Sequence, residues 1–68
     1  MLLVSGTTTL PYRYGMKVKV HRDVKGKVRY AAVYKGDEHI TNYDGRNAER
    51  EAILWVLGYI QGADDART

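Results

Sequence analysis

Cysteine is absent from this 68-residue chain, and histidine occurs only at His21 and His39. Without cysteine the protein can form neither a disulfide nor a cysteine-based zinc site. Two histidines are too few for an all-histidine metal centre, so we expect no bound metal and no cofactor. A single domain of this size is near the lower limit for an independent core. Small domains without disulfides or bound metals can gain stability by self-association, so we expect a homodimer.

Long hydrophobic runs are also lacking. The chain opens with one short apolar segment, Leu2–Val4, and no basic residue precedes it. This segment is too short for the core of a signal peptide or for a membrane span. Because the lack of cysteine also fits a reducing compartment, we expect a cytoplasmic protein without membrane contact.

Charge of the two signs is unevenly distributed. The segment from Tyr12 to Lys35 contains eight basic residues and a single acid, Asp23, whereas the remainder contains three basic and seven acidic residues. Such separation suggests an anionic partner for the basic segment, either nucleic acid or an acidic protein surface, or head-to-tail self-association. Solvated strand surfaces are the simpler alternative.

Alternating residues predict a sheet of three antiparallel strands at 12–22, 27–35 and 38–43. Gly26 suits the left-handed position of a three-residue hairpin loop, and Gly36-Asp37 suits a two-residue turn. Residues 1–11 form either an arm or a short extra strand that ends at Pro11.

The strand register decides which side chains share a face. If Asp23 pairs with Lys27, Val20 lies opposite Tyr30, and Ala32 and Tyr34 follow on the same side. This register directs the tyrosines of all three strands toward the helix. It also leaves Val33 and Ile40 together on the opposite, basic face, so either that face has an apolar centre or the register differs.

Residues 46–61 are predicted to form the single helix, with Asp44 or Asn47 as its cap, Gly62 as its stop and 62–68 as a polar tail. The predicted fold class is therefore α+β, a three-stranded antiparallel sheet packed by one C-terminal helix. The apolar arc of this helix spans roughly 200°, wider than one sheet covers. Its members are Ala48, Ala52, Ile53, Trp55, Val56, Leu57, Tyr59 and Ile60, and Leu54 falls on the polar side. The surplus surface predicts a protein interface. Its residues are Leu54, Trp55 and Tyr59 on the helix, with Val33 and Ile40 on the sheet.

The run Asn47-Ala48-Glu49-Arg50-Glu51-Ala52-Ile53 at the start of the helix resembles the ribonuclease H-like fold. The first half of that fold is a three-stranded meander followed by a helix, and its helix carries a glutamate metal ligand. The resemblance covers about residues 16–60 and would place Glu49 at that position. The family's first-strand aspartate would correspond to Asp23, which already lies in the turn and is followed by Val24 instead of glycine, and the remaining catalytic carboxylates have no counterparts here. The likeness therefore implies a truncated, non-catalytic derivative, as in HicB-type antitoxins.

A second resemblance is to DNA-binding domains that lay a three-stranded sheet in the major groove with one helix behind it. The arm-binding domains of tyrosine recombinases and the plant ethylene-response type are examples. The likeness is carried by the outward row Arg13, Lys17, Lys19, His21 and Arg29, followed by Tyr43-Asp44 and an Ala/Glu-rich helix. It implies a sheet that contacts phosphates or guanine edges.

The sequence contains no phosphate loop, nucleophile–base pair or metal-spaced cluster, and we therefore predict that the protein is not an enzyme. Our leading hypothesis is a small nucleic-acid-binding module that uses a basic sheet face. The alternative is a protein-binding inhibitor or antitoxin-like module, which could be phage-encoded, acting through the helix flank or the apolar sheet patch. The predicted nucleic-acid-binding residues are Lys17, Lys19, His21, Lys27, Arg29 and Lys35.

Overall fold

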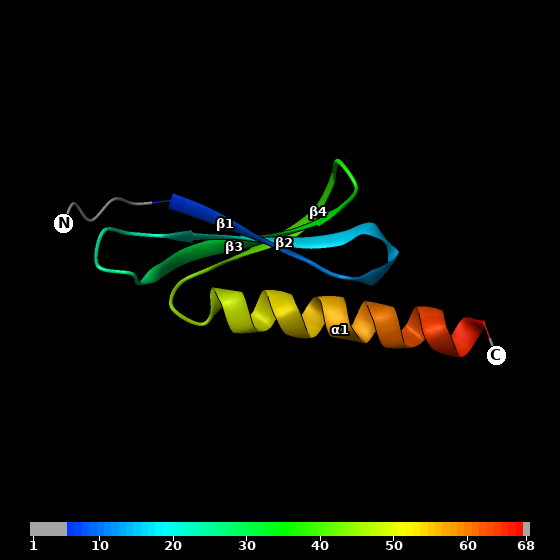
Figure 1. Cartoon of the computed structure of the whole chain (residues 1–68). Helices are drawn as coiled ribbons and strands as arrows, with labels where there is room; N and C mark the ends of the chain where they lie inside the picture. Colours follow the sequence, from blue (N-terminus) through cyan, green and yellow to red (C-terminus); the bar gives the residue numbers. More distant parts are fainter. Residues whose placement is uncertain (1–5, 68) are drawn as a thin grey trace.

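The computed structural model, which describes residues 6–67, is an α+β fold of four antiparallel strands packed against one C-terminal helix (Figure 1). The strands lie in the order β1-β2-β3-β4, each joined to the next by a hairpin. The elements are β1 (Gly6–Pro11), the 3-10 turn η1 (Arg13–Gly15), β2 (Met16–Arg22), β3 (Val28–Lys35), β4 (Glu38–Asp44) and α1 (Ala48–Ala66).

The N-terminal segment supplies the extra strand that the sequence left open. Strand β1 pairs with β2, and residues 1–5, the rest of the predicted arm or strand, lie outside the described residues. The predicted strand 12–22 begins only at Met16, because Tyr14 and Gly15 both adopt positive φ angles, 61° and 73°. Two consecutive left-handed residues turn the chain back on itself, so 12–15 form the β1–β2 connection.

The two predicted hairpin turns are present. Gly26 (φ 83°) and Gly36 (φ 60°) occupy left-handed positions that favour glycine. In the first loop, the Asp23 carboxylate accepts hydrogen bonds from the backbone N–H groups of Lys25 (2.9 Å) and Lys27 (3.0 Å). The hydrogen bond from the Lys27 N–H is the main cause of a lowered pKa at Asp23. Partial desolvation of the Asp23 carboxylate acts in the opposite direction.

The predicted register is correct only next to the first hairpin. The backbone N–H of Asp23 donates to the carbonyl of Lys27 (2.9 Å), as expected. A β-bulge then inserts Arg29, so that Arg22 pairs with Val28 but His21 pairs with Tyr30. Compared with the predicted register, this one extra residue turns every later side chain of β3 to the opposite face of the sheet. Tyr30, Ala32 and Tyr34 therefore point away from the helix, and the prediction that Tyr30 and Tyr34 face it is wrong.

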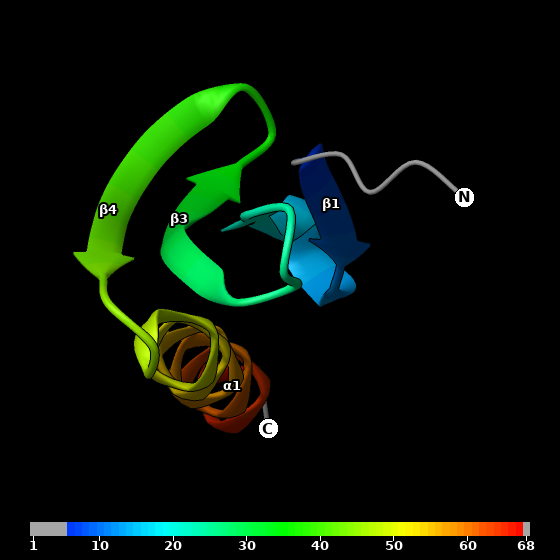
Figure 2. The ribbon, with the colours of Figure 1, turned by 90° about the vertical axis from the view of Figure 1, so that its left-hand side faces the viewer.

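The core lies between α1 and strands β2, β3 and β4, and Figure 2 shows the helix beneath this part of the sheet. Its fully buried side chains come from alternate positions of β2 and β3 and from one stripe of the helix. They are Met16, Val18, Val20, Ala31, Val33, Ala48, Ala52 and Val56. A second bulge, which leaves Ile40 without an opposite residue on β3, lets Ile40 pack against this cluster. Because Val33 is 0% exposed, the apolar patch predicted at Val33 and Ile40 is part of the core and not a surface.

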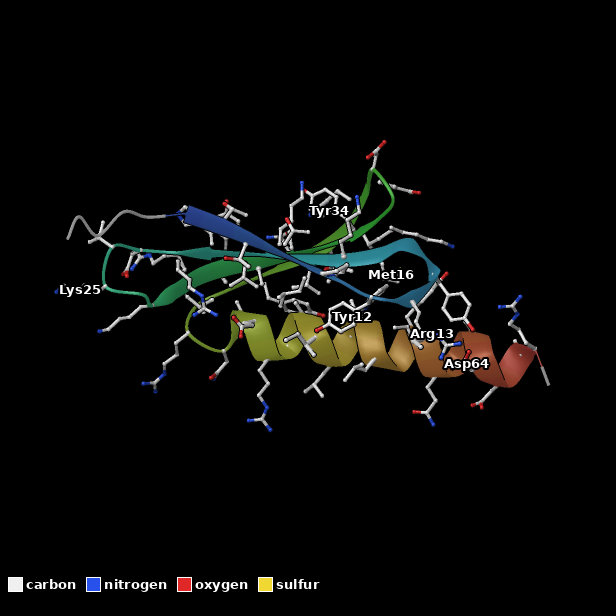
Figure 3. The ribbon with its side chains drawn as sticks, viewed as in Figure 1. Tyr12, Arg13, Met16, Lys25, Tyr34 and Asp64 are labelled. Carbon is white, nitrogen blue, oxygen red and sulfur yellow. The ribbon has the colours of Figure 1, made fainter. Side chains whose placement is uncertain are left out.

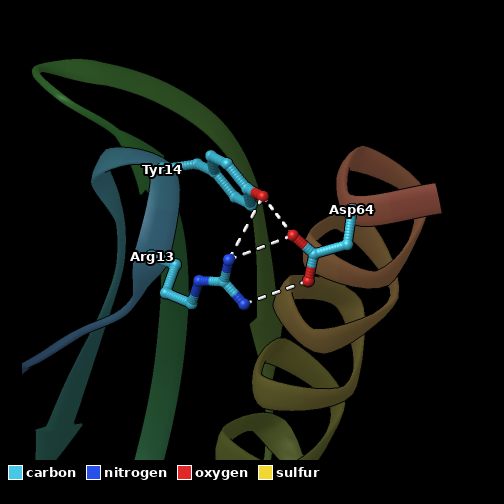
Figure 4. Close-up of polar contacts among 3 residues, drawn as sticks. All are labelled: Arg13, Tyr14 and Asp64. Carbon is cyan, nitrogen blue, oxygen red and sulfur yellow. Dashed lines mark hydrogen bonds and ion pairs between the residues drawn. The ribbon is translucent and has the colours of Figure 1, made fainter. Parts of the chain in front are cut away.

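Helix α1 begins after Asn47, whose side chain makes no capping hydrogen bond, and continues past the predicted stop at Gly62 to Ala66. The prediction of a polar tail from residue 62 is therefore wrong for most of that segment. The last turns are fixed by Asp64, which accepts hydrogen bonds from Arg13 and Tyr14 in the β1–β2 connection (Figure 4). No helix in residues 6–67 has the length and hydropathy needed to cross a membrane.

Polar contacts attach α1 to the sheet along its length. Arg22 on β2 forms an ion pair with Glu49 in the first turn of the helix. The Lys35 ammonium donates a hydrogen bond to the Tyr59 hydroxyl (2.7 Å), and this bond raises the pKa of Lys35. Asp64 completes the series at the other end. These contacts hold the helix to one side of the sheet, and within residues 6–67 no other element packs on the opposite side.

Candidate nucleic-acid interface on the open sheet face

The face of the sheet that points away from α1, here called the open face, carries cations beside aromatic rings. Figure 3 shows Tyr34 directed away from the helix, whereas Tyr12 lies between sheet and helix. The alternation of β2 and β3 about their pairing defines the central residues of this face. They are Lys17, Lys19 and His21 on β2 and Tyr30, Ala32 and Tyr34 on β3.

These residues form two parallel rows, one cationic and one aromatic. Lys17 lies opposite Tyr34, Lys19 opposite Ala32, and His21 opposite Tyr30. Adjacent strands are about 4.8 Å apart, so each row lies within side-chain reach of the other. On β4, the neighbours of the aromatic row are His39, Asn42 and Asp44. The open face is therefore mainly cationic along β2, and it carries one acid, Asp44 of β4, beside Tyr30.

His21 and Tyr30 form a stacked pair, with ring centroids 5.0 Å apart and ring planes inclined by 10°. On its other side, the Nδ1 atom of His21 lies 3.3 Å from the Thr7 hydroxyl of β1. Tyr30 remains 41% exposed, a high value for a tyrosine on a central strand. The pair is therefore held in a fixed orientation while one aromatic surface stays open to solvent.

Tyr34 is paired with a cation. The Lys19 ammonium lies 4.5 Å from the centroid of the Tyr34 ring, within the range of a cation–π contact. His39 of β4 approaches the same tyrosine edge-on, at 5.3 Å between centroids. The Lys19 charge therefore lies above an aromatic ring on the side of the sheet that faces away from α1.

The other predicted nucleic-acid-binding residues lie elsewhere. Lys35 faces the helix side and contacts Tyr59, so it does not belong to the open face. Lys27 and Arg29 lie near the β2–β3 hairpin, where they line a shallow hollow together with Gly45 and Arg46. The structure therefore brings Lys17, Lys19 and His21 together, places Lys27 and Arg29 at the end of the same sheet, and separates Lys35 from both groups.

The predicted helix interface is divided in the same way. Trp55 and Tyr59 stack on each other (5.9 Å between centroids) and pack partly against the core. Leu54 is 57% exposed, in agreement with its predicted place on the polar side of the helix, and Leu57 is 47% exposed although the sequence placed it in the apolar arc. The solvent-facing apolar surface of α1 therefore consists of Leu54 and Leu57.

Glu49, the residue highlighted by the ribonuclease H-like resemblance, has a cation as its neighbour. Its carboxylate forms the ion pair with Arg22, and both side chains are partly exposed. Within the described range 6–67, no three His, Cys, Asp or Glu side chains lie close enough together to hold a metal ion. In this arrangement Glu49 helps to attach the helix to the sheet.

Sequence reasoning missed Tyr30 and Tyr34 as open-face residues. The signal that could have placed them is on the same strand, because Ala31 and Val33 share one face and Ile40 of the next strand was expected beside them. An apolar run on one face normally marks the buried side. Taking Ala31 and Val33 as the core face would have turned both tyrosines outward, but it would also have required an extra residue near Arg29.

Comparisons with known protein families, with curated proteins and with solved structures found no match to this chain.

Proposed function

We propose that this protein binds nucleic acid through the open face of its sheet and does not act as an enzyme. The observation that carries the proposal is the cationic row of β2 lying directly beside the aromatic row of β3, on the face that α1 leaves uncovered. Lys and Arg side chains supply the phosphate contacts that dominate affinity for nucleic acids. Exposed aromatic rings supply surfaces for bases.

The arrangement of the tyrosines favours this function over a merely solvated surface. Solvated strand faces need charge, but they gain nothing from large rings held outside the core. Here two tyrosines occupy the outward positions of a central strand, and each contacts a cationic or titratable side chain, Lys19 or His21. Lys27 and Arg29 extend the positive charge toward the hairpin end of the sheet.

Binding of fluorescently labelled DNA and RNA, followed by anisotropy across a salt series, tests the proposal. The affinity should fall as salt rises, because each neutralised phosphate contributes a slope of about −0.7 to −0.9 in the log–log plot. Lys17→Glu and Lys19→Glu should each weaken binding and reduce that slope. Arg67→Glu makes the same change of charge at the far end of α1, so it is the matched control and should have a much smaller effect.

Two results would contradict the proposal. One is the absence of binding even at low salt. The other is an equal loss of affinity for Lys19→Glu and Arg67→Glu, which would mean that only total charge matters and that the open face has no special role.

Protein binding is the second candidate function, and the specific observation that favours it is the exposure of Leu54 and Leu57 on α1. Two neighbouring leucines on the solvent side of a helix are typical of a surface that packs against another helix. The opposite side of the same helix already covers the sheet. A protein partner could therefore bind α1 while the open face stays accessible.

A further inference from the structure

We infer that the preferred ligand of the open face is single-stranded nucleic acid, with bases stacked on Tyr30 and Tyr34 and phosphates along Lys17 and Lys19. This inference rests on the proposed function and specifies its substrate class. It starts from the separation of the two rows, because a single strand likewise has its charge on one side and its aromatic bases on the other.

The spacing of the rings fits unpaired bases. Tyr30 and Tyr34 are four residues apart on a regular stretch of β3, which corresponds to roughly 13 Å along the strand. Stacked bases follow each other at about 3.4 Å, so the two rings accept bases that are separated and splayed apart. Ala32, the small residue between them, leaves room for the chain to pass.

A duplex cannot use these rings. Its bases are stacked on their neighbours and offer only their edges to a protein, in the grooves. On the open face the ring surfaces themselves are accessible, since Tyr30 is 41% exposed and Tyr34 is half-buried. A ring surface of this kind is complementary to a base surface and indifferent to its edge pattern, so we expect little sequence preference.

Lys19 has a part in this mode of binding. Its ammonium lies over the Tyr34 ring at 4.5 Å, on a surface that a base would occupy. A base that takes this place displaces the ammonium toward solvent, where the phosphate of the same nucleotide lies. One movement of a long, flexible side chain therefore exchanges a weak cation–π contact for a stacked base and an ion pair.

Anisotropy titrations of the full chain with short oligothymidylate, oligouridylate, an abasic strand of equal length and a duplex test this inference. Both base-bearing single strands should bind at least about fivefold more tightly than the abasic strand, which has the same phosphates but nothing to stack. Comparison of oligouridylate with oligodeoxyuridylate, which carries the same base, shows whether the 2′-hydroxyl contributes. Tyr30→Leu and Tyr34→Leu should abolish the advantage of the base-bearing strands.

Matched variants distinguish a loss of base stacking from a loss of folding. Tyr30→Phe and Tyr34→Phe retain the ring and should bind like the unmodified protein, and Tyr59→Leu removes a ring on the helix side and should do the same. If the abasic strand or the duplex binds as tightly as oligothymidylate, the single-strand inference is wrong although nucleic-acid binding stands. If nothing binds at low salt, both are wrong.

A second inference comes independently from the outward side of α1. We propose that this surface pairs with α1 of a second copy in an antiparallel homodimer. At about 100° per residue, six positions fall within one arc of about 100° on the side opposite Ala52 and Val56. They are Arg50, Leu54, Leu57, Gly58, Gln61 and Asp65.

These six residues complement one another when two copies of α1 lie antiparallel. A two-fold axis between Leu57 and Gly58 sets Arg50 of one copy against Asp65 of the other and Leu54 against Gln61. Opposite charges then meet at both ends, and the leucines of both copies fill the centre. Charge complementarity thus identifies the occupant of this apolar surface as a second copy of the chain.

Gly58 supports the same arrangement. It lies inside the helix, where glycine is unfavourable relative to alanine, and a Cβ atom built there meets nothing within 4 Å. Packing within one chain therefore gives no reason for a glycine at this position. In the antiparallel pair Gly58 lies at the centre, where the absence of a side chain lets the two helices approach closely.

Sedimentation velocity over a range of protein concentrations tests the dimer. The mass should rise from the 7.7 kDa of one chain toward twice that value as concentration increases. Leu54→Asp and Leu57→Asp should remain monomeric, whereas Val24→Asp, which alters a similarly exposed apolar residue in the β2–β3 loop, should dimerise normally. Gly58→Ala should weaken the dimer and Gly62→Ala should not.

A charge exchange tests the antiparallel orientation. Arg50→Glu should weaken dimerisation, and the double variant Arg50→Glu/Asp65→Arg should restore it, because the exchanged charges again lie opposite each other. A mass of one chain at every concentration, or a dimer that ignores all of these substitutions, would show that the outward side of α1 is not the contact.

Discussion

The Tyr14 hydroxyl donates a hydrogen bond to the Asp64 carboxylate, joining the β1–β2 connection to the last turns of α1 across 50 residues of sequence (Figure 4). The Arg13 guanidinium contacts both oxygens of the same carboxylate, at 3.0 and 3.1 Å. Through the tyrosine hydrogen bond first, and through Arg13 as well, the pKa of Asp64 is held below its ordinary value of 3.8.

This contact predicts an acid-sensitive helix end. Because the pKa of Asp64 is lower in the folded protein, its contribution to stability is complete above the unfolded pKa and is lost as pH falls through the folded one. Amide exchange or chemical shifts of residues 61–66 should therefore report loosening as the pH falls below the ordinary aspartate pKa of 3.8. Asp64→Asn should remove most of this pH dependence, Tyr14→Phe should reduce it, and Glu51→Gln on the exposed helix surface should leave it unchanged.

The buried position of Met16 predicts a large loss of stability on truncation. Met16 is 1% exposed, and Met16→Ala should lower the free energy of unfolding by about 2–5 kcal/mol, because a cavity replaces the lost contacts. For a domain of this size that is a large part of the total. Val24→Ala, at a position 50% exposed in the hairpin loop, should change the value by less than about 0.5 kcal/mol. Urea denaturation measures both, and equal effects would place Met16 outside the core.

The glycines of the loop and of the helix predict opposite effects of alanine. Gly26 has φ 83°, where a Cβ atom is strained, so Gly26→Ala should destabilise the protein by about 1–2 kcal/mol. Gly62 lies in the helix with open space around its missing Cβ, so Gly62→Ala should stabilise it by about 1 kcal/mol. Thermal denaturation of the two variants should shift in opposite directions. A loss of stability in Gly62→Ala would indicate a contact at that position.

The bulge at Arg29 predicts that β3 tolerates the loss of this one residue. Deletion of Arg29 leaves Arg22 opposite Val28 and His21 opposite Tyr30, so the β2–β3 pairing becomes continuous and Tyr30 and Tyr34 stay on the open face. The deletion variant should therefore keep a cooperative thermal unfolding transition, followed by circular dichroism. Arg29→Ala keeps the extra residue and is the matched control. Loss of the cooperative transition in the deletion variant but not in Arg29→Ala would show that the bulge itself is needed for folding.

The features of the fold on the two sides of the Arg29 bulge differ in how well the sequence predicted them. The hairpins followed from Gly26 and Gly36, and the buried stripe of α1 followed from the spacing of Ala48, Ala52 and Val56. Local conformation and periodicity carry these features, and both can be read from neighbouring residues. The extra residue in β3 has no such local mark, because it is selected by the packing of Ala31 and Val33 against the helix.

The residues of the candidate site were likewise predicted only in part. Lys17, Lys19 and His21 were predicted from alternation within one strand, and the structure places them together. The tyrosines beside them depended on pairing between two strands and were assigned to the wrong face. The end of α1 was missed for a similar reason, because Asp64 is fixed by Tyr14, a residue far away in the sequence.

The one-sided position of α1 has a consequence for how this protein can diverge. Within the part of the chain that the structure describes, almost every buried side chain lies on the helix side of the sheet, and Ala32 is the one buried residue of the open face. Substitutions at the outward positions of β2 and β3 therefore change the chemistry of this surface with little effect on the packing beneath it. If the open face binds nucleic acid as proposed, single mutations there can change its specificity while residues on the other side of the sheet maintain its stability.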